Sequence, residues 1–259
     1  MRNFKETAKI VVKVGTSSLT FKNGSLNLKK IESLARVVTD LKNSGKEVVL
    51  VSSGAIGVGV SRLNLKSRPE DSPGKQAMAA IGQCQLMSIY DEFFRKYNQI
   101  VGQVLLTKDV VVNDKMNKNA VNTFTALLAY GVIPIVNEND TVSTDEIEFG
   151  DNDTLSAYVA NIINADLLIM LTDIDGLYDK NPCEEGAKLI TEVNAITNSI
   201  RQVAGGAGSS RGTGGMQTKI MAAEIAAKTK TKTIIMSGED PSLIYDVFDG
   251  ADVGTYFNL

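Results

Sequence analysis

Two lysines stand at positions where their ammonium groups need an anion. Lys13 lies inside the apolar run from Lys9 to Val14, and Lys219 follows a glycine-rich stretch, close to the start of a helix-like segment. Burying an ammonium group without a partner is costly, so we expect Lys13 to extend its amine past the end of a strand toward an anion. For Lys219 the sequence leaves a second interpretation open, that of a solvated lysine on a helix surface.

Polar residues follow four apolar runs of the chain. The clusters are Lys13-Val14-Gly15-Thr16-Ser17, Ser52-Ser53-Gly54-Ala55, Asn137-Glu138-Asn139-Asp140 and Thr172-Asp173. Any one of them has a structural explanation, because Gly, Ser, Asn and Asp are the residues that turns and helix caps use. Their shared position favours a ligand site, since the ligands of an open parallel sheet bind beyond the carboxyl ends of its strands.

Glycine-rich segments indicate where phosphate groups could approach the backbone. The glycines whose backbone amides suit a phosphate are Gly15, Gly54, Gly57 and Gly59. No stretch fits the P-loop pattern or the dinucleotide pattern GxGxxG, which argues against a standard P-loop or Rossmann site. The segment from Gly205 to Gly215 is either a flexible linker or an anion site at the start of the helix-like stretch MQTKIMAAEIAAK.

The chain of 259 residues contains no histidine. This excludes Ser-His-Asp and Cys-His nucleophiles and histidine-ligated metals. Carboxylates between residues 173 and 184 follow the rhythm of a calcium loop, but the required glycine would fall at Tyr178 and Pro182 intrudes, so we expect a turn against a nucleotide instead. Cys84 and Cys183 stand in no metal or redox spacing, and we predict no metal ligands from the protein.

The composition is typical of a soluble globular protein. Hydrophobic residues make up 43% and charged residues 22%, and the net charge of −3 argues against a nucleic-acid binder with a broad basic face. The amino terminus lacks the apolar stretch of a signal peptide, and no apolar run approaches the roughly 20 residues of a membrane span. Because a chain of this length needs no disulfide, we expect a cytoplasmic protein.

Short apolar runs alternate with helix-like stretches along the chain. We predict strands over residues 9–14, 47–51, 100–106, 132–136, 167–171 and 233–236. The segment from Leu28 to Leu41 carries one apolar helical stripe, with Gly45 as its stop. This alternation indicates an α/β fold with a mainly parallel sheet and helices on both faces. Near residues 164–166 two halves meet without a linker, so we expect a single domain over residues 1–259 with one sheet and two lobes.

Taken in order, these clusters resemble the amino acid kinase family. The strings that carry the resemblance are VVKVGTS, VSSGAIGVG, KQAMAAIGQ, GQVLLT, PIVNENDTV, FGDNDTLSA, LLTDIDGLY and GTGGMQTK. The resemblance implies an αβα three-layer sandwich, with a glutamate-binding lobe over residues 1–165 and an ATP-binding lobe over residues 166–259. It further implies phosphorylation of the γ-carboxylate of L-glutamate by ATP, the first step of proline biosynthesis, with Mg²⁺ bound mainly through the nucleotide.

The resemblance also implies roles for individual residues. Lys13 and Lys219 match the two lysines on the transferring phosphoryl group, and Asp153 matches the carboxylate that organises them. Ser53, Asp140 and Asn152 match positions that contact glutamate. The positions that match nucleotide contacts are Lys13, Thr172, Asp173, Thr213, Gly214, Gly215, Met216, Gln217, Thr218 and Lys219.

Two departures from the family pattern concern assembly and regulation. Many relatives carry an added PUA domain of the kind associated with RNA binding, whereas we expect none here. A run that reads asparagine-alanine-arginine in relatives is Asn119-Ala120-Val121 in this chain. The resemblance implies a homo-oligomer with feedback inhibition by proline, and the two departures leave the oligomeric arrangement and the inhibition open. From the net charge, the missing appended domain and the lack of long apolar runs we expect no nucleic-acid or membrane partner.

The chemistry of a carboxylate acceptor agrees with these residues. A glutamate side chain, with a pKa of about 4.3, is already ionised at neutral pH and needs no general base. The acidic residues Glu138, Asp140 and Asp151 suit a free α-ammonium group, but they suit a phosphorylated acceptor such as UMP poorly. Aspartate, acetylglutamate, carbamate and UMP stay open as acceptors, as does a catalytically silent metabolite-binding protein.

Overall fold

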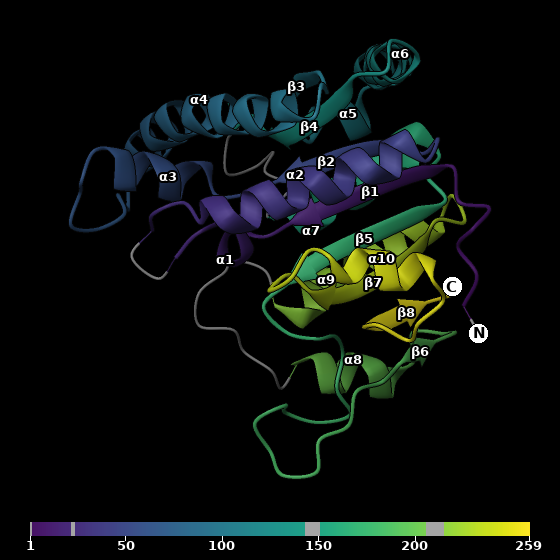
Figure 1. The fold of residues 1–259 in the computed structure, drawn as a ribbon. Helices are drawn as coiled ribbons and strands as arrows, with labels where there is room; N and C mark the ends of the chain where they lie inside the picture. Colours follow the sequence, from purple (N-terminus) through teal and green to yellow (C-terminus); the bar gives the residue numbers. More distant parts are fainter. Residues whose placement is uncertain (1, 22–23, 143–150, 206–214) are drawn as a thin grey trace.

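The computed structural model describes residues 2–21, 24–142, 151–205 and 215–259, and within these ranges it contains one eight-stranded sheet (Figure 1). The strands lie in the order β3-β4-β2-β1-β5-β7-β8-β6. Their bounds are β1 Lys9–Val14, β2 Glu47–Ser52, β3 Val101–Leu106, β4 Ile133–Glu138, β5 Leu167–Thr172, β6 Glu192–Val193, β7 Lys232–Ser237 and β8 Thr255–Phe257. All neighbouring strands pair in parallel except β7 and β8, which are antiparallel.

The strand predictions are confirmed for six strands, each within two residues at either end. The prediction of one continuous sheet is confirmed as well, because β1 from the first half pairs directly with β5 from the second. The short strands β6 and β8 were not predicted, since segments of two or three residues are too short to show an alternating pattern.

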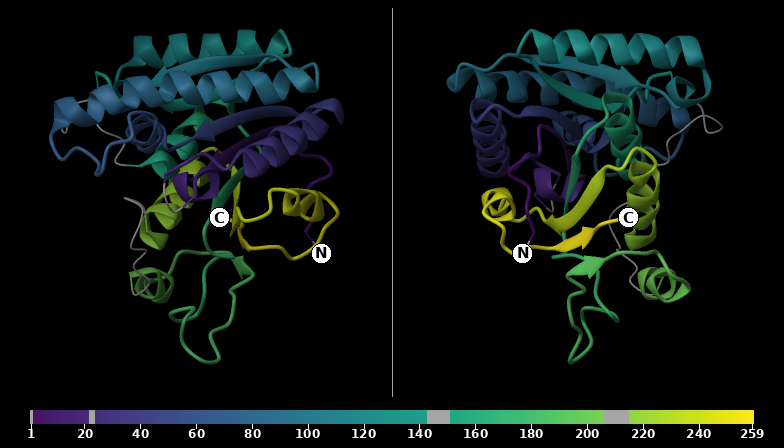
Figure 2. Two further views of the ribbon diagram at one scale, coloured as in Figure 1. Left: turned by 60° about the vertical axis from the view of Figure 1, so that its left-hand side comes forward. Right: turned by 90° about the vertical axis from the view of Figure 1, so that its right-hand side faces the viewer.

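Helices cover both faces of the sheet, as the views from the side also show (Figure 2). On one face, the hydrophobic core includes residues of α1 Thr16–Leu19, α2 Leu28–Asn43, α3 Ala55–Arg62, α4 Ser72–Lys96 and α10 Leu243–Phe248. On the other face, it includes residues of α5 Asp109–Val112, α6 Asp114–Ala129, α7 Asn152–Ile163, α8 Asn198–Gly205 and α9 Met216–Ala227. No helix in the described ranges is long and apolar enough to cross a membrane.

Side-chain alternation along β1 decides which face each residue meets. Ile10, Val12 and Val14 belong to the core on the α2 face, whereas Val11 belongs to the core on the α7 face. Successive side chains of a strand point to opposite faces, so Lys13 shares the side of Val11 and faces α7 and α9. The predicted helix after β1 is also confirmed: α2 ends at Asn43, and Gly45 follows with φ +91°.

Helices α3 and α4 touch through their backbones at two glycines. A Cβ atom at Gly59 would lie 2.1 Å from the carbonyl oxygen of Met78, and one at Gly82 would lie 1.8 Å from that of Ala55. Neither position accepts a side chain without separation of the two helices. Since α3 begins at Ala55, directly after Ser53 and Gly54, this contact fixes the loop at the carboxyl end of β2 against α4.

We expect Gly59→Ala to lower the free energy of unfolding by about 1–3 kcal/mol, because the new methyl group overlaps a backbone carbonyl rather than a flexible side chain. Gly57→Ala on the same helix is the matched control, since the nearest atom to its Cβ is 4.0 Å away. Alanine there should leave stability unchanged or raise it by up to about 1 kcal/mol. Urea unfolding followed by circular dichroism measures both, and equal effects would contradict the close helix contact.

Candidate functional site

Three buried charged side chains meet at the carboxyl end of β1. The ammonium nitrogen of Lys13 lies 2.6 Å from Oδ1 of Asp153, and that of Lys219 lies 3.0 Å from Oδ2 of the same carboxylate. Asp153 is 1% exposed, and each lysine is 7% exposed. Lys13 was expected to face an anion, and within the protein that anion is the carboxylate of Asp153. Lys219 is buried, so the alternative interpretation of a solvated lysine on a helix surface is wrong.

Three separate elements bring these groups together. Lys13 comes from β1, Asp153 from the first turn of α7, and Lys219 from the first turn of α9. The hydroxyl group of Thr218 lies 3.1 Å from Oδ2 of Asp153 and 2.8 Å from the carbonyl oxygen of Gly215, so the start of α9 is tied to the same carboxylate. The predicted helix start after Gly215 is confirmed.

The electrostatics of this cluster keep Asp153 ionised. Burial by itself would raise the pKa of Asp153, but the ammonium groups of Lys13 and Lys219 outweigh this effect and lower the pKa to about 2. With both lysines charged, the two ammonium groups and one carboxylate carry a net charge of +1. The cluster can therefore attract an anion while each of its members already has a partner.

A second group of polar side chains lies at the carboxyl ends of β2 and β4. The amide nitrogen of Asn152 is 2.7 Å from the carbonyl oxygen of Ser52 and 3.0 Å from the hydroxyl group of Ser53. It is also 2.8 Å from Oδ1 of Asn137, which in turn accepts a hydrogen bond from the backbone amide of Glu138. The structure thus brings together Ser53 and Asn152, two of the three positions predicted to contact glutamate.

The first turn of α7 connects the two groups, because Asn152 and Asp153 are consecutive. Residues one apart on a helix point about 100° away from each other, so Asn152 faces the ends of β2 and β4 while Asp153 faces the lysines. Asp151 precedes them as the N-cap, with its Oδ1 accepting from the backbone amide of Thr154 at 2.8 Å. One oxygen of this predicted acidic residue therefore caps the helix.

The remaining predicted residues are spread around these groups. Asp140 lies two residues beyond the end of β4 and is partly buried. Thr172 ends β5 and its hydroxyl group donates to the carboxylate of the exposed Asp173, while Met216 and Gln217 open α9. Thr213 and Gly214 lie outside the described residues.

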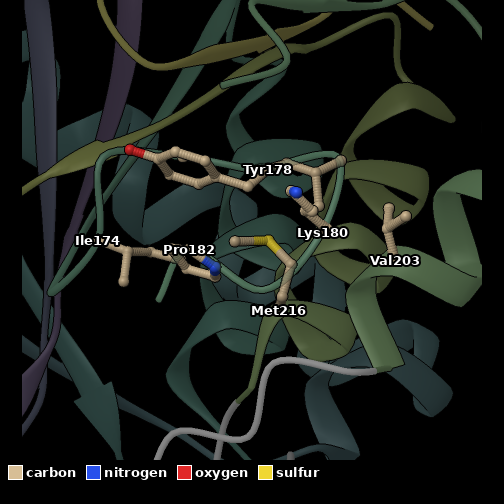
Figure 3. A pocket seen from close by; sticks show the side chains of 8 residues that line it. Ile174, Tyr178, Lys180, Pro182, Val203 and Met216 are labelled. Atoms are coloured by element: carbon tan, nitrogen blue, oxygen red, sulfur yellow. The ribbon is translucent and has the colours of Figure 1, made fainter. Parts of the chain in front are cut away.

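A pocket lies between the start of α9 and the segment that follows β5 (Figure 3). Its lining is mostly apolar and includes Ile174, Leu177, Tyr178, Pro182, Val203 and Met216. The side chain of Met216 extends toward Tyr178 and Pro182 (Figure 3). The expected turn after Asp173 therefore forms one wall of a small, mostly apolar pocket.

Sequence reasoning did not assign Ser52, Asn137, Gln83 or Tyr90 to the site. Ser52 and Asn137 stood in two of the polar clusters, and side-chain alternation along β2 and β4 could have placed both on the α4 face. Gln83 and Tyr90 lie in the middle of the long helix α4, where no local pattern separates a residue that contacts the site from one that does not.

Comparison with known proteins agrees with the sequence resemblance. The model of the amino acid kinase family matches residues 8–237. A glutamate 5-kinase from Clostridium perfringens is 55% identical over 258 residues, which cover 98% of this chain and 96% of that protein. A glutamate 5-kinase from Listeria welshimeri is 52% identical over 260 residues, with coverage of 98% and 94%.

Two solved structures share the fold at low sequence identity. Carbamate kinase from Giardia lamblia bound to AMP-PNP has a TM-score of 0.71 at 17% identity and covers 98% of this chain and 99% of its own. An isopentenyl phosphate kinase from T. acidophilum has a TM-score of 0.65 at 17% identity, with coverage of 96% and 100%. At this identity the likeness shows the α/β sandwich architecture alone, and thereby confirms the predicted fold class.

Asp153→Asn removes the anion and leaves two ammonium groups buried side by side. We expect it to lower the free energy of unfolding by about 3–5 kcal/mol at pH 7, the scale for breaking a buried ion pair. Glu32→Gln, which affects a pair with Lys96 that is exposed on both sides, should cost less than about 1 kcal/mol.

The decrease in the free energy of unfolding caused by Asp153→Asn should also depend on pH. The lowered pKa of Asp153 contributes about 2 kcal/mol of stability above the usual pKa of 3.8, and this contribution disappears as the pH falls toward 2. Urea unfolding at pH 7, 5 and 3 should therefore show a difference between wild type and Asp153→Asn that is constant down to pH 5 and smaller at pH 3. A constant difference over the whole range would contradict the pKa shift.

Proposed function

The chain belongs to the amino acid kinase family, and from this premise we propose that it is a glutamate 5-kinase. The reaction is the transfer of the terminal phosphoryl group of ATP to the γ-carboxylate of L-glutamate, giving ADP and γ-glutamyl phosphate, the first step of L-proline biosynthesis. The observation that carries the proposal is the buried pair of lysines on Asp153, next to the Ser53–Asn152 contact. Two glutamate 5-kinases that align along nearly their whole length support the choice of acceptor.

The residue types of this chain are compatible with the proposed reaction. The γ-carboxylate of glutamate is ionised at neutral pH and attacks without a general base, so the absence of histidine is no obstacle. The difficulty is electrostatic, because an anion must approach a triphosphate that is itself negatively charged. Positioning and charge compensation therefore account for most of the catalysis in phosphoryl transfer.

Lys13 and Lys219 supply that compensation in our proposal. Asp153 holds both ammonium groups before the substrates bind, so they need little reorganisation when charge moves across the transferring group. The lysines come from β1 and α9, which lie in the two predicted lobes, and the phosphoryl group passes between them. Mg²⁺ accompanies ATP and is bound mainly through the phosphates of the nucleotide.

Ser53, Asn152 and Asp140 form the acceptor side in our proposal. The amide nitrogen of Asn152 is held by the carbonyl oxygen of Ser52, which leaves its Oδ1 to accept a hydrogen bond from the substrate amine. The carboxylate of Asp140 pairs with the same α-ammonium group. An acetylated amine would gain nothing from this pair, and a phosphorylated acceptor would be repelled by it.

The nucleotide side comprises Thr172, Asp173 and the start of α9 with Gly215, Met216, Gln217 and Thr218. The amino terminus of α9 suits the phosphates, and the apolar side chains of Met216, Ile174 and Tyr178 lie beside it, where we place the nucleobase. Thr213 and Gly214 belong to the same predicted contact segment.

The proposed function also assigns a role to each half of the chain. Residues up to about 165 form the glutamate-binding lobe, and residues from about 166 form the ATP-binding lobe. We propose a cytoplasmic enzyme, as the composition predicts, that assembles as a homo-oligomer, as the family resemblance implies. The two departures from the family pattern leave inhibition by proline open.

An assay with hydroxylamine tests the proposed function, because hydroxylamine traps an acyl phosphate as a hydroxamate. We expect ATP-dependent hydroxamate with L-glutamate. For L-aspartate, which is shorter by one methylene group, we expect kcat/KM to be lower by about 10- to 200-fold. N-acetylglutamate should also be a poor acceptor, because it lacks the ammonium group. A kcat/KM for aspartate or N-acetylglutamate that equals or exceeds the value for glutamate would overturn the assignment.

Lys13→Ala and Lys219→Ala should each lower kcat by about 10²- to 10³-fold, the scale for losing one preorganised group that stabilises the transition state. Lys9→Ala is the control, because Lys9 lies on the same strand in a largely exposed pair with Glu47. It should keep wild-type kcat. Near-normal turnover in either of the first two variants would remove that lysine from the mechanism.

A further inference from the structure

Helix α4 makes two polar contacts with the residues that hold Asn152. Oε1 of Gln83 accepts a hydrogen bond from the amide nitrogen of Asn137 at 2.9 Å, and the hydroxyl group of Tyr90 lies 2.9 Å from that of Ser52. Gln83 and Tyr90 are seven positions apart, which is two helical turns, so they lie on one face of α4. That face therefore reaches the ends of two strands, β4 and β2.

The hydrogen bonds fix the orientation of each amide group. The backbone amide of Glu138 can only donate, so Asn137 must present its Oδ1 to it and to Asn152. The amide nitrogen of Asn137 then faces Gln83, which must present Oε1. An acceptor at position 83 thus holds Asn137 in the orientation that Asn152 needs.

Tyr90 acts on the same amide through Ser52. Its side chain is 1% exposed and packs against Phe94, with ring centroids 6.4 Å apart. Ser52 is 2% exposed, and its carbonyl oxygen accepts the shortest of the hydrogen bonds from Asn152. The bond between the two hydroxyl groups therefore holds the residue that anchors Asn152.

The backbone contact between α3 and α4 makes this support rigid. Gly82 lies directly before Gln83 and touches the carbonyl group of Ala55, which opens α3 just after the Ser52–Gly54 loop. The distance between α4 and this loop is thus set by van der Waals contact between backbones. Polar side chains on α4 can then hold their partners at a fixed distance.

We propose that Gln83 and Tyr90 are positioning residues that hold Asn152 for the phosphoryl acceptor, Gln83 through Asn137 and Tyr90 through Ser52. The inference rests on the proposed function, because Asn152 is taken there as an acceptor contact. In this proposal neither residue touches the acceptor, and within the described residues their side-chain hydrogen bonds go to Asn137 and Ser52 rather than to Lys13, Asp153 or Lys219. Their loss therefore weakens acceptor binding and leaves ATP binding and turnover at saturation largely intact.

The first test uses Gln83→Leu, which keeps the size of the side chain and removes its acceptor. We expect KM for glutamate to rise about tenfold, with KM for ATP and kcat within about twofold of wild type. Gln83→Glu retains an acceptor for Asn137 and should restore most of the acceptor affinity. Gln85→Leu makes the same chemical change on a different face of α4 and should leave KM for glutamate unchanged.

The second test uses Tyr90→Phe, which removes one hydroxyl group. We expect a rise in KM for glutamate of about five- to tenfold, again without a matching change in KM for ATP. Tyr245→Phe is the control, because it removes a hydrogen bond to Asp40 between α10 and α2. It should keep wild-type kinetics.

A double variant separates positioning from general destabilisation. In an Asn152→Ala background, Gln83→Leu should raise KM for glutamate by less than about twofold further, since the residue it positions is gone. Equal increases of KM for glutamate and ATP, no change in either single variant, or full additivity with Asn152→Ala would overturn the positioning role. Lack of glutamate turnover in the wild type would instead refute the proposed function, and the same variants would then be tested with the acceptor that the wild type uses.

Discussion

Two buried ammonium groups share one buried carboxylate, and much of the site depends on this arrangement. Each of the three charges would cost several kcal/mol if buried alone, so β1, α7 and α9 are energetically coupled through Lys13, Asp153 and Lys219. The sheet reinforces the coupling, because β1 pairs with β5, which leads into Thr172 and Asp173, two proposed nucleotide contacts. A displacement of any one of these elements would leave a charge without its partner. The ion pairs therefore stabilise the relative positions of β1, α7 and α9, and the fold in turn keeps the three charges together.

The amino terminus of α7 transmits this constraint to the rest of the site. Asp153 is fixed by the lysines, and Asn152, one residue earlier, is fixed by hydrogen bonds to the ends of β2 and β4. A helix is stiff over one residue, so Asn152, the proposed acceptor contact, and Asp153, which pairs with both lysines, keep a constant separation. In the proposed function, a single helical turn therefore sets the geometry between the acceptor and the phosphoryl group.

Much of this site could be predicted from the sequence, because the patterns that indicate it are local. Lys13 was recognisable as a charge inside an apolar strand, and the polar clusters marked strand ends that the parallel sheet collects at one edge. The pairing of both lysines with Asp153 came from the family resemblance, since residues 13, 153 and 219 are brought together only by the tertiary fold. Gln83 ends the family string KQAMAAIGQ but was given no role, and Tyr90 lies outside every such string, because a polar residue in a long helix looks the same whether it faces solvent or a strand end. The short strands β6 and β8 were too brief for any periodicity.

The shared carboxylate also explains how flexible side chains can serve as preorganised groups. A free lysine carries about 2 kcal/mol of rotamer entropy, which is lost when its ammonium group is held in one place. In this protein Asp153 orders both lysines when the chain folds, so little of that loss remains for the reaction itself. One carboxylate against two ammonium groups leaves a net charge of +1, enough to favour an incoming phosphate. A second carboxylate would cancel that attraction, and the absence of any would leave two mutually repelling charges. Two lysines with one aspartate therefore satisfy the stability of the fold and, in the proposed function, the electrostatics of phosphoryl transfer.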